Sequence, residues 1–254
     1  MKKIIFFDID NTIVDNKTEL IPPRTLKMLE DLSKDDNYYL GIATGRGPGR
    51  LEIIKDVLHF FDAFVLSNGA YVIFKDEVIY DCAFPIFEIE NILRVGDQYD
   101  FLIGASGLQH DALLRKPEVK QVHLRNAAKL CPDFYKDHPV YQMWMVSDDH
   151  DLLEKAVNEM PQFDHYFWTT IGVDLTVNNH SKGSGILKIK EKLMPIEVIS
   201  IGDGHNDIDM IEVADIGIAM ANSRFEELKE KADLVGPNVS DDLLYDFLIK
   251  HKII

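Results

Sequence analysis

Apolar and polar positions along the first third of the chain predict strands and helices in alternation. The segment 3–7 is dominated by an apolar run, which is typical of a strand covered on both faces. Two prolines then precede a helical pattern with Leu26, Leu29 and Leu32 on one face. The stretches "YYLGIA" and "AFVL" predict further strands, with a helix over "RLEIIKDVL" between them. This alternation predicts right-handed crossovers and a parallel sheet.

The middle of the chain departs from this rhythm. The stretch "YVIFKDEVIYD" alternates around Lys75 and Asp76 and predicts a hairpin. It is followed by a helical pattern in "FEIENILRV", a strand in "VYQMWMVS", a helix after the acidic run at Asp148, and a hairpin over "YFWTT" and "GVDLTVN". This order is typical of an α+β domain, which we expect over residues 83–179.

From Ser181 onward the alternation of strand and helix returns. Strands are predicted in "IEVISIGDG" and "IGIAM", and helices around "DIDMIEVA" and "RFEELKEKA". The simplest architecture is therefore of the α/β class. A Rossmann-like parallel-sheet domain would be built from residues 1–82 and 180–254, and the α+β domain would be inserted into it.

Composition and charge exclude several classes of protein. The chain has 254 residues and a formal net charge of −16, which argues against nucleic-acid binding and against docking on anionic membranes. Its two cysteines, Cys82 and Cys131, form no CxxC pair, so a disulfide framework or a zinc site is not expected. Asp8 interrupts the only apolar run that could begin a signal peptide, and no run is long enough to span a membrane. We expect a soluble cytoplasmic protein.

Chemically distinctive turns follow three of the predicted strands. They are "DIDNT" from Asp8, "TGR" from Thr44 and "GDGHND" up to Asp207. The carboxyl ends of parallel strands share one edge of a sheet, so Asp8, Asp10, Asp203 and Asp207 would crowd together there. Like charges at such distances oppose ionisation, and a divalent cation would relieve that conflict. Ligation by oxygen atoms alone favours Mg²⁺, which commonly also joins a substrate phosphate.

Groups that could hold a phosphate accompany these carboxylates. Thr44 supplies a hydroxyl, and the turn at Gly45 lets backbone N–H groups approach a ligand. Lys182, in "SKGSG", lies just ahead of a predicted helix and offers the fixed positive charge that a phosphoryl dianion requires.

Four motifs, in order, resemble those of the haloacid dehalogenase superfamily of phosphohydrolases: "DIDNT", "ATGR", "SKGSG" and "GDGHND". A lone DxDxT is weak, but the ordered set is specific. The chain is most similar to the Cof-type branch, subfamily IIB, in which a C2-type cap lies between the second and third motifs. The likeness covers essentially the whole chain, loosely so in the cap. Asn11 stands where the family usually has glycine, and we expect it to keep the left-handed turn.

The resemblance implies a role for each matched residue. Asp8 would be the nucleophile that accepts the phosphoryl group, and Asp10 would protonate the leaving oxygen and then activate water. The phosphoryl oxygens would be held by Thr44, Gly45, Lys182 and Asn206. Mg²⁺ would be held by the carboxylates of Asp8 and Asp203 and by the backbone carbonyl of Asp10. Asp207 would orient a metal-bound water or Lys182.

The resemblance thus implies a Mg²⁺-dependent phosphatase that acts on a small phosphorylated metabolite. A sugar phosphate is the first expectation, and a phosphorylated cofactor such as pyridoxal phosphate or flavin mononucleotide is the second. We expect a monomer or small homo-oligomer. A phosphomutase of the same superfamily is one alternative, and a non-enzymatic phosphoryl-accepting or binding module is another. A module of that kind would not need an acid at Asp10, two positions after the nucleophile.

Overall fold

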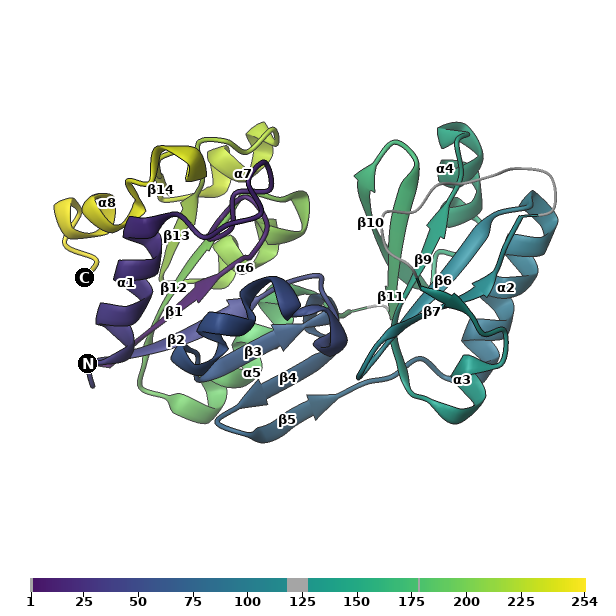
Figure 1. Cartoon of the computed structure of the whole chain (residues 1–254), viewed down its shortest axis with the longest axis horizontal. Helices are drawn as coiled ribbons and strands as arrows, with labels where there is room; N and C mark the ends of the chain where they lie inside the picture. The colour runs from purple at the N-terminus through teal and green to yellow at the C-terminus, as the bar shows by residue number, and fades with distance from the viewer. Residues whose placement is uncertain (1, 118–127, 178) are drawn as a thin grey trace. The chain divides into compact units, whose positions relative to one another are not determined.

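The apolar run at the start of the chain forms strand β1 (Lys3–Phe7), which lies inside a larger sheet (Figure 1). It pairs in parallel with β2 (Tyr38–Ala43) on one side and with β12 (Glu197–Gly202) on the other. The side chains from Ile4 to Phe7 are completely buried, because apolar clusters cover both faces of the strand.

The computed structural model describes residues 2–117, 128–177 and 179–254. The chain forms two compact units. The first, here called the core unit, comprises Met1–Gly45, Leu51–Tyr80 and Ser181–Ile254. The second, the cap unit, comprises Arg46–Arg50 and Asp81–His180. Each unit encloses its own cluster of buried apolar side chains.

The core sheet has eight strands among the described residues, in the order β14-β13-β12-β1-β2-β3-β4-β5. The strands from β14 to β3 are parallel, as predicted, and β4 pairs antiparallel with β3. Lys75 and Asp76 join β4 to β5 with φ of 45° and 62°, as a tight hairpin turn requires. The remaining strands are β3 (Ala63–Leu66), β4 (Tyr71–Phe74), β5 (Glu77–Asp81), β13 (Ile216–Ala219) and β14 (Leu234–Val235).

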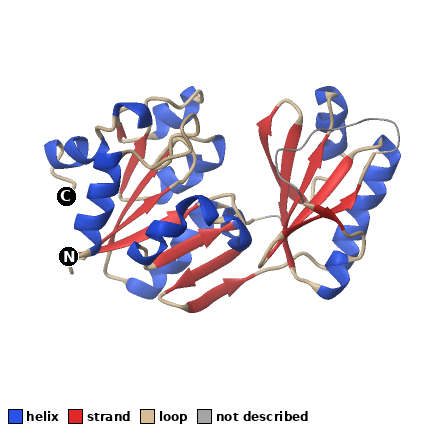
Figure 2. Cartoon of the chain, viewed as in Figure 1, coloured by secondary structure: helices blue, strands red, loops and turns tan. Residues whose placement is uncertain are grey.

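Helices cover both faces of the core sheet (Figure 2), and alternate residues of β1 pack against different helices. Ile5 and Phe7 pack in a cluster with α1, η2 and α8, whereas Ile4 and Phe6 pack in a cluster with α5 and α6. None of the helices in the described ranges combines the length and apolar character that a membrane crossing requires. The described helical segments of the core unit are α1 (Pro23–Ser33), η2 (Glu52–Phe60), η3 (Ser67–Gly69), α5 (Lys182–Leu193), η4 (His205–Asp207), α6 (Ile208–Val213), α7 (Glu226–Lys231), η5 (Val239–Asp241) and α8 (Leu244–Lys250). The short helix η1 (Pro48–Arg50) belongs to the cap unit.

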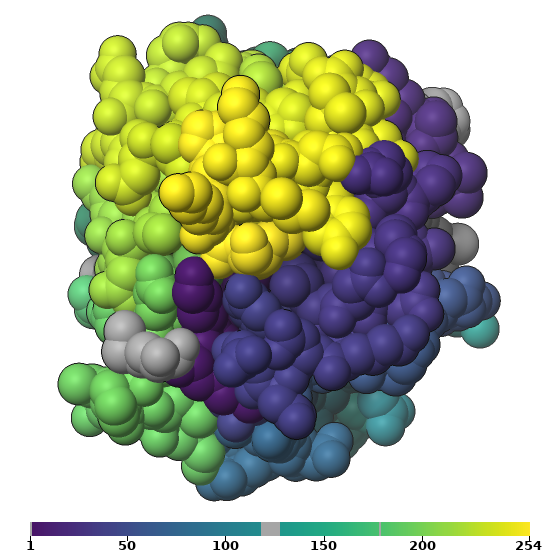
Figure 3. All heavy atoms as spheres, turned by 90° about the vertical axis from the view of Figure 1, so that its left-hand side faces the viewer, coloured from purple at the N-terminus to yellow at the C-terminus, as the bar shows by residue number. Residues whose placement is uncertain are grey.

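The C-terminal segment packs beside α1, where yellow and purple atoms meet in Figure 3. The hydroxyl of Tyr245 donates to a carboxylate oxygen of Asp31 over 3.0 Å. The carboxylate of Asp242 accepts from the backbone N–H groups of Arg24 (2.8 Å) and Thr25 (3.0 Å). Asp242 therefore caps α1 from a distant part of the chain, since the residue before that helix, a proline, provides no side-chain cap.

One predicted helix differs in form from the expectation. The segment "RLEIIKDVL" contributes to the 3₁₀ helix η2 and not to an α-helix, with a kink at Ile54 (φ −118°, ψ 17°). Ile54 and Val57 are nevertheless buried against the sheet. The apolar spacing identified the face that is buried but not the hydrogen-bond pattern of the backbone.

The cap unit has the α+β character that the sequence predicted. Its described residues form a six-stranded sheet in the order β10-β11-β9-β6-β7-β8, antiparallel except for β7 and β8. Helices α2 and α4 contribute to the apolar cluster that the sheet buries. The elements are α2 (Ile86–Tyr99), β6 (Leu102–Gly107), β7 (Asp111–Arg115), β8 (Lys129–Leu130), α3 (Phe134–Asp137), β9 (Val140–Val146), α4 (His150–Asn158), β10 (Phe163–Thr169) and β11 (Gly172–Val177).

The short segment Arg46–Arg50 belongs to the cap unit although it directly follows Gly45. Arg50 Nε lies 3.4 Å from Asp111 Oδ2, at the start of β7. Gly49 packs so closely on a neighbouring loop that a Cβ atom there would lie 2.3 Å from the backbone oxygen of Gln109. An ion pair and a close backbone contact thus attach the segment to the cap unit.

Candidate active site

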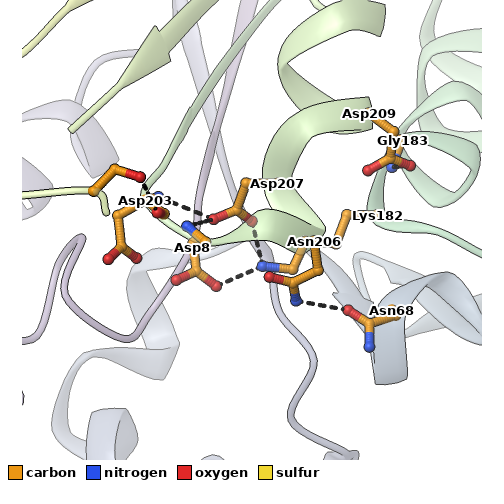
Figure 4. A network of polar contacts seen from close by, with 10 residues as sticks. Asp8, Asn68, Lys182, Gly183, Asp203, Asn206, Asp207 and Asp209 are labelled. Atoms are coloured by element: carbon orange, nitrogen blue, oxygen red, sulfur yellow. Dashed lines mark hydrogen bonds and ion pairs between the residues drawn. The ribbon is translucent and has the colours of Figure 1, made fainter. Parts of the chain in front are cut away.

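Asp8 follows β1 directly and continues its pairing with β12, because its backbone N–H donates to the carbonyl of Ile201 over 2.9 Å. The carboxylate is buried, with 8% of the side chain exposed. Its partner comes from a distant part of the sequence: Lys182 Nζ lies 2.7 Å from Asp8 Oδ1 (Figure 4). A buried carboxylate at the end of this strand is therefore matched by a buried ammonium.

Lys182 is the first residue of α5, and hydrogen bonds at the start of that helix fix its position. Ser181 and Ser184 form a reciprocal capping box, in which the Ser181 hydroxyl accepts from the Ser184 N–H over 3.1 Å. The N–H of Gly183 donates to Asp209 Oδ2 on α6 over 2.9 Å. Burial alone would lower the pKa of Lys182, but the carboxylates of Asp207 and Asp8 raise it well above its usual value. Lys182 is thus a permanent cation.

Asp207 uses both carboxylate oxygens within the protein. Oδ1 forms a very short ion pair with Lys182. Oδ2 accepts from the backbone N–H groups of Asp203 (2.9 Å) and Gly204 (2.7 Å). The side chain is completely buried. Asp207 therefore holds the loop after β12 and the lysine at the same time.

Asp203 is partly buried and is supported by two residues from the turn after β13. Ser223 Oγ donates to its backbone carbonyl over 2.6 Å. Asn222 Nδ2 lies 3.4 Å from Asp203 Oδ2 and 2.9 Å from the carbonyl oxygen of Asn11. Asn222 therefore links the loop after β12 to the loop after β1. The sequence contains no signal that singles it out, because its role depends on where the backbone of Asn11 lies.

The loop after β1 folds back on itself between Ile9 and Val14. Val14 N–H donates to the Ile9 carbonyl over 2.9 Å, and Asn11 N–H donates to the Val14 carbonyl over 2.7 Å. Asn11 has a φ of 56°, which confirms the left-handed turn expected where the family usually has glycine. This turn keeps Asp10 close enough to Asp8 for its charge to act on that carboxylate.

Three carboxylates converge closely enough to share a metal ion. Asp8, Asp203 and Asp207 each offer an oxygen, and these atoms lie within 4.8 Å of one another. Burial raises the pKa of Asp8 well above its ordinary value, Lys182 opposes the rise, and the neighbouring carboxylates add to it. Burial and then the charge of Asp207 raise the pKa of Asp203 to about 7. The excess of negative oxygen donors fits a hard divalent cation such as Mg²⁺.

Thr44 and Gly45 follow the neighbouring strand β2. The Thr44 N–H donates to the Val65 carbonyl on β3 over 2.9 Å, and the Thr44 side chain is buried. A Cβ atom on Gly45 would lie 3.3 Å from Asn68 Nδ2 and 3.4 Å from Asn206 Nδ2. Asn206 Nδ2 also donates to Asn68 Oδ1 over 2.9 Å. Two side-chain amides thus border Gly45, and the sequence motifs predicted a role for only one of them, Asn206.

The turns that the sequence predicted to converge do so within the core unit. Direct contacts connect Asp8, Lys182, Asp207 and Asp203 (Figure 4). Gly45 lies beside Asn206. His205, which lies inside the fourth motif, is exposed and packs against Phe225 with a ring separation of 5.6 Å. The chemistry at this edge of the sheet is therefore that of carboxylates, one ammonium and neutral hydrogen-bond donors.

A parallel sheet with such a carboxylate–lysine cluster at its strand ends is the core of a haloacid dehalogenase-like hydrolase. The sequence profile of the haloacid dehalogenase-like hydrolases matches residues 5–248, and the chain belongs to this family. The superfamily assignment made from the four motifs, and with it an enzyme of the hydrolase class, is confirmed.

Individual proteins extend the comparison. The chain is 32% identical over 252 residues, or 94% of each sequence, to "Putative phosphatase YkrA" of Bacillus subtilis strain 168. It is similar to a crystal structure from Geobacillus kaustophilus HTA426, with 26% identity, a TM-score of 0.86 and full coverage of both chains. The subclass IIB sugar phosphatase BT4131 has 26% identity, a TM-score of 0.85 and the same coverage. These likenesses confirm the expected fold class.

Proposed function

We propose that this enzyme is a Mg²⁺-dependent phosphatase that hydrolyses a small phosphorylated metabolite through an aspartyl-phosphate on Asp8. The observation that carries the proposal is the contact between Asp8 Oδ1 and Lys182 Nζ at the end of β1. A carboxylate held there by a fixed cation is oriented for attack, and the same cation can neutralise the oxygens of an incoming phosphoryl group.

The reaction would proceed in two displacements at phosphorus. In the first, an oxygen of Asp8 attacks phosphorus, the bond to the leaving oxygen breaks, and Asp10 donates a proton to that oxygen. In the second, water attacks the phosphorus of the aspartyl-phosphate, Asp10 removes its proton, and the Asp8 carboxylate leaves. Inorganic phosphate is released, and both aspartates return to their starting states.

Four residues would hold the phosphoryl oxygens during both steps: Thr44, Gly45, Lys182 and Asn206. Lys182 supplies charge, and the other three supply neutral donors from a hydroxyl, a backbone N–H and an amide. Support comes from the position of Gly45 beside Asn206 and from the position of Lys182 against Asp8. Positioning and charge neutralisation of this kind provide most of the catalysis of phosphoryl transfer.

Mg²⁺ would be held by the carboxylates of Asp8 and Asp203 and by the backbone carbonyl of Asp10. When bound, the ion would neutralise charge on the nucleophile and on the phosphoryl group. Asp207 would not be a direct ligand, because Lys182 and two backbone N–H groups occupy its oxygens. It would instead keep the Asp203 loop and Lys182 in place.

The substrate would be a sugar phosphate or a phosphorylated cofactor. The likeness to the sugar phosphatase BT4131 supports the first of these. The net charge of −16 supports a small-molecule substrate over a nucleic acid or an anionic membrane surface. We also propose that the enzyme acts in the cytoplasm, as a monomer or small homo-oligomer.

Release of inorganic phosphate from p-nitrophenyl phosphate tests the proposal. Purified enzyme with Mg²⁺ should hydrolyse the compound, chelation of the metal should stop the reaction, and Asp8→Asn should lower kcat by at least about 10³-fold. The matched control is Asp36→Asn, an exposed aspartate outside the site, which should behave as wild type. Equal rates for wild type and Asp8→Asn would refute the proposal. If the wild-type enzyme is active, a screen of phosphorylated metabolites would identify its substrate.

A further inference from the structure

The turn between β3 and β4 has an unusual backbone. Ser67, Asn68 and Gly69 have φ values of 49°, 51° and 91°, so three consecutive residues lie in the left-handed region. Glycine adopts this region readily and asparagine tolerates it, but serine does not, so Ser67 stays there only because its surroundings impose it. All three residues are buried. Such strain is concentrated at functional sites, which makes the surroundings of this turn informative.

The surroundings connect the turn to two of the phosphate-binding motifs. The N–H of Asn68 donates to the Thr44 carbonyl over 3.1 Å. On the other side, a Cβ atom on Gly69 would lie only 2.1 Å from the carbonyl oxygen of Ser181, the residue that caps the helix of Lys182. The backbone of the turn is therefore held between the strand end at Thr44 and the start of α5.

The Asn68 side chain has one satisfied end and one unsatisfied end. Oδ1 accepts from Asn206 Nδ2 over 2.9 Å, which leaves Nδ2 as the donor at the other end of the amide. Nδ2 has no hydrogen-bond partner within the part of the chain that the structure describes, although only 1% of the residue is exposed. A buried donor without a partner is unfavourable, so a ligand that accepts from it would gain affinity.

The unsatisfied donor lies beside Gly45, whose backbone N–H is expected to bind the phosphoryl group. The Cβ position of Gly45 is 3.3 Å from Asn68 Nδ2 and 3.4 Å from Asn206 Nδ2. Both amide groups therefore lie around the turn whose backbone N–H groups would bind phosphate. In Figure 4 the Asn68 amide faces that of Asn206, and Asp207, the residue after Asn206, contacts Lys182.

We propose that Asn68 is a further phosphoryl-binding residue, whose Nδ2 donates to a phosphoryl oxygen while its Oδ1 orients the amide of Asn206. This inference rests on the proposed phosphatase function. The chemistry favours an anion, since the free group is a donor beside a second amide and a backbone turn rich in N–H groups. A neutral donor also adds no charge to a site that already contains a permanent cation.

Two substitutions distinguish the role of the donor Nδ2 from that of the acceptor Oδ1. Asn68→Gly removes the whole side chain at a position whose φ glycine tolerates. Asn68→Asp keeps an acceptor for Asn206 and replaces the donating group by an oxygen, at a φ that aspartate also tolerates. The matched control is Asp76→Gly, which removes an exposed side chain at a φ of 62° in the hairpin turn.

With p-nitrophenyl phosphate and Mg²⁺, both Asn68 variants should lose about 10²-fold in kcat/KM, as expected for loss of a donor to a developing charge. The inhibition constant for inorganic phosphate should rise about tenfold in Asn68→Gly, and more in Asn68→Asp because of repulsion. Asp76→Gly should match wild type. A merely structural role would lower the Tm and leave the inhibition constant unchanged.

The inference is overturned if both variants keep the kcat/KM of wild type, or if the Tm falls while the inhibition constant for phosphate stays unchanged. It is also overturned if Asn68→Asp alone behaves as wild type, because only the bond to Asn206 would then matter. If Asn68→Gly fails to fold, Asn68→Asp decides. If wild type releases no phosphate, the proposed function fails separately, and the binding of inorganic phosphate with Mg²⁺ is then measured by calorimetric titration. In that experiment, absence of phosphate binding or equal affinity in wild type and variants would overturn the inference.

Discussion

Lys182 Nζ lies 2.7 Å from Asp8 Oδ1, although 174 positions separate the two residues in the sequence. Both side chains are buried, and Lys182 also contacts Asp207. The contact exists because Asp8 directly follows β1 while Lys182 begins α5, so the edge of the sheet and the start of a helix meet. It is the feature on which both the stability of the site and its chemistry depend.

Lys182→Met should abolish activity and destabilise the fold. Removing the ammonium leaves the carboxylates of Asp8 and Asp207 buried without a counter-charge, which costs about 3–5 kcal/mol in comparable cases. Activity should fall at least about 10³-fold because the phosphoryl group loses its cation. Urea unfolding and phosphate release measure the two effects. Lys250→Met, at an exposed lysine, is the control, and near-wild-type activity in Lys182→Met would contradict the assigned role.

Asp203→Asn should impair the response to Mg²⁺ more than it impairs folding. The change removes one negative oxygen donor from the cluster with Asp8 and also removes repulsion from Asp207. The Mg²⁺ concentration for half-maximal activity should rise at least about tenfold, while the Tm stays the same or increases. Activity measured across a Mg²⁺ titration tests this expectation. An unchanged titration curve would show that Asp203 does not hold the metal.

Asn222→Ala should loosen the link between the loops that carry Asp8 and Asp203. The variant loses hydrogen bonds to the Asn11 carbonyl (2.9 Å) and from the Val239 N–H (2.8 Å). We expect a loss of about 1–3 kcal/mol in the free energy of unfolding and a weaker response to Mg²⁺. Asn37→Ala, which removes an exposed hydrogen bond, should have little effect. If the two variants behave alike in both assays, Asn222 has no positioning role.

Gly69→Ala should damage both stability and activity, whereas Gly236→Ala should be tolerated. A Cβ atom at Gly69 would lie 2.1 Å from the Ser181 oxygen at a φ of +91°, but at Gly236 the nearest atom is 3.4 Å away. The first variant must therefore shift the start of α5 and with it Lys182. We expect a loss of about 2–4 kcal/mol for Gly69→Ala, measured by denaturant unfolding. Equal stability of the two variants would contradict this reasoning.

The cap unit should show a pH-dependent stability that originates at Asp174. Burial raises the pKa of Asp174 to about 7, against the opposing effects of Gln142 and Arg50. The folded chain therefore retains a proton that the unfolded chain loses near pH 4, so this residue lowers stability progressively from about pH 4 to pH 7 and no further above it.

Asp174→Asn should remove that dependence. The variant should match wild type near pH 4 and exceed it at pH 8 by up to about 4 kcal/mol, visible as a higher Tm. Asp36→Asn, at an exposed position, should follow wild type at both values. A difference between Asp174→Asn and wild type that is independent of pH would exclude titration of Asp174 as its origin.

The sequence predicted the parts of the site that rest on side-chain chemistry. Asp8, Lys182, Asp203 and Asp207 stand out because carboxylates and a lysine flank apolar strands and a helix start, and parallel strands bring their ends together. The structure places these four in contact, while their individual catalytic roles stay predictions. The fold class followed from the same alternation of apolar runs.

The residues that escaped prediction depend on backbone geometry. Asn68 and Asn222 resemble ordinary turn residues in the sequence, and their contacts with Asn206 and the Asn11 carbonyl exist only in the folded chain. Strand β6 was likewise not predicted, because its own Gly104 and Gly107 interrupt the alternating pattern on which a strand prediction depends. Strand β7 was not predicted either, because its apolar run is only three residues long and lies between Asp111 and Arg115. Hydrophobic periodicity contains no information on such side-chain contacts or on strands with an irregular apolar pattern.

The pairing of β1 with β12 also has a consequence for synthesis on the ribosome. Lys3 pairs with Glu197, so one edge of the first strand lacks its neighbour until roughly 190 further residues have been translated. At 5–20 residues per second that interval lasts about 10–40 s. The contiguous segment Asp81–His180 emerges during this wait and can become compact first. A nascent chain stalled before Glu197 would therefore expose an apolar strand edge, which is where chaperones would be needed.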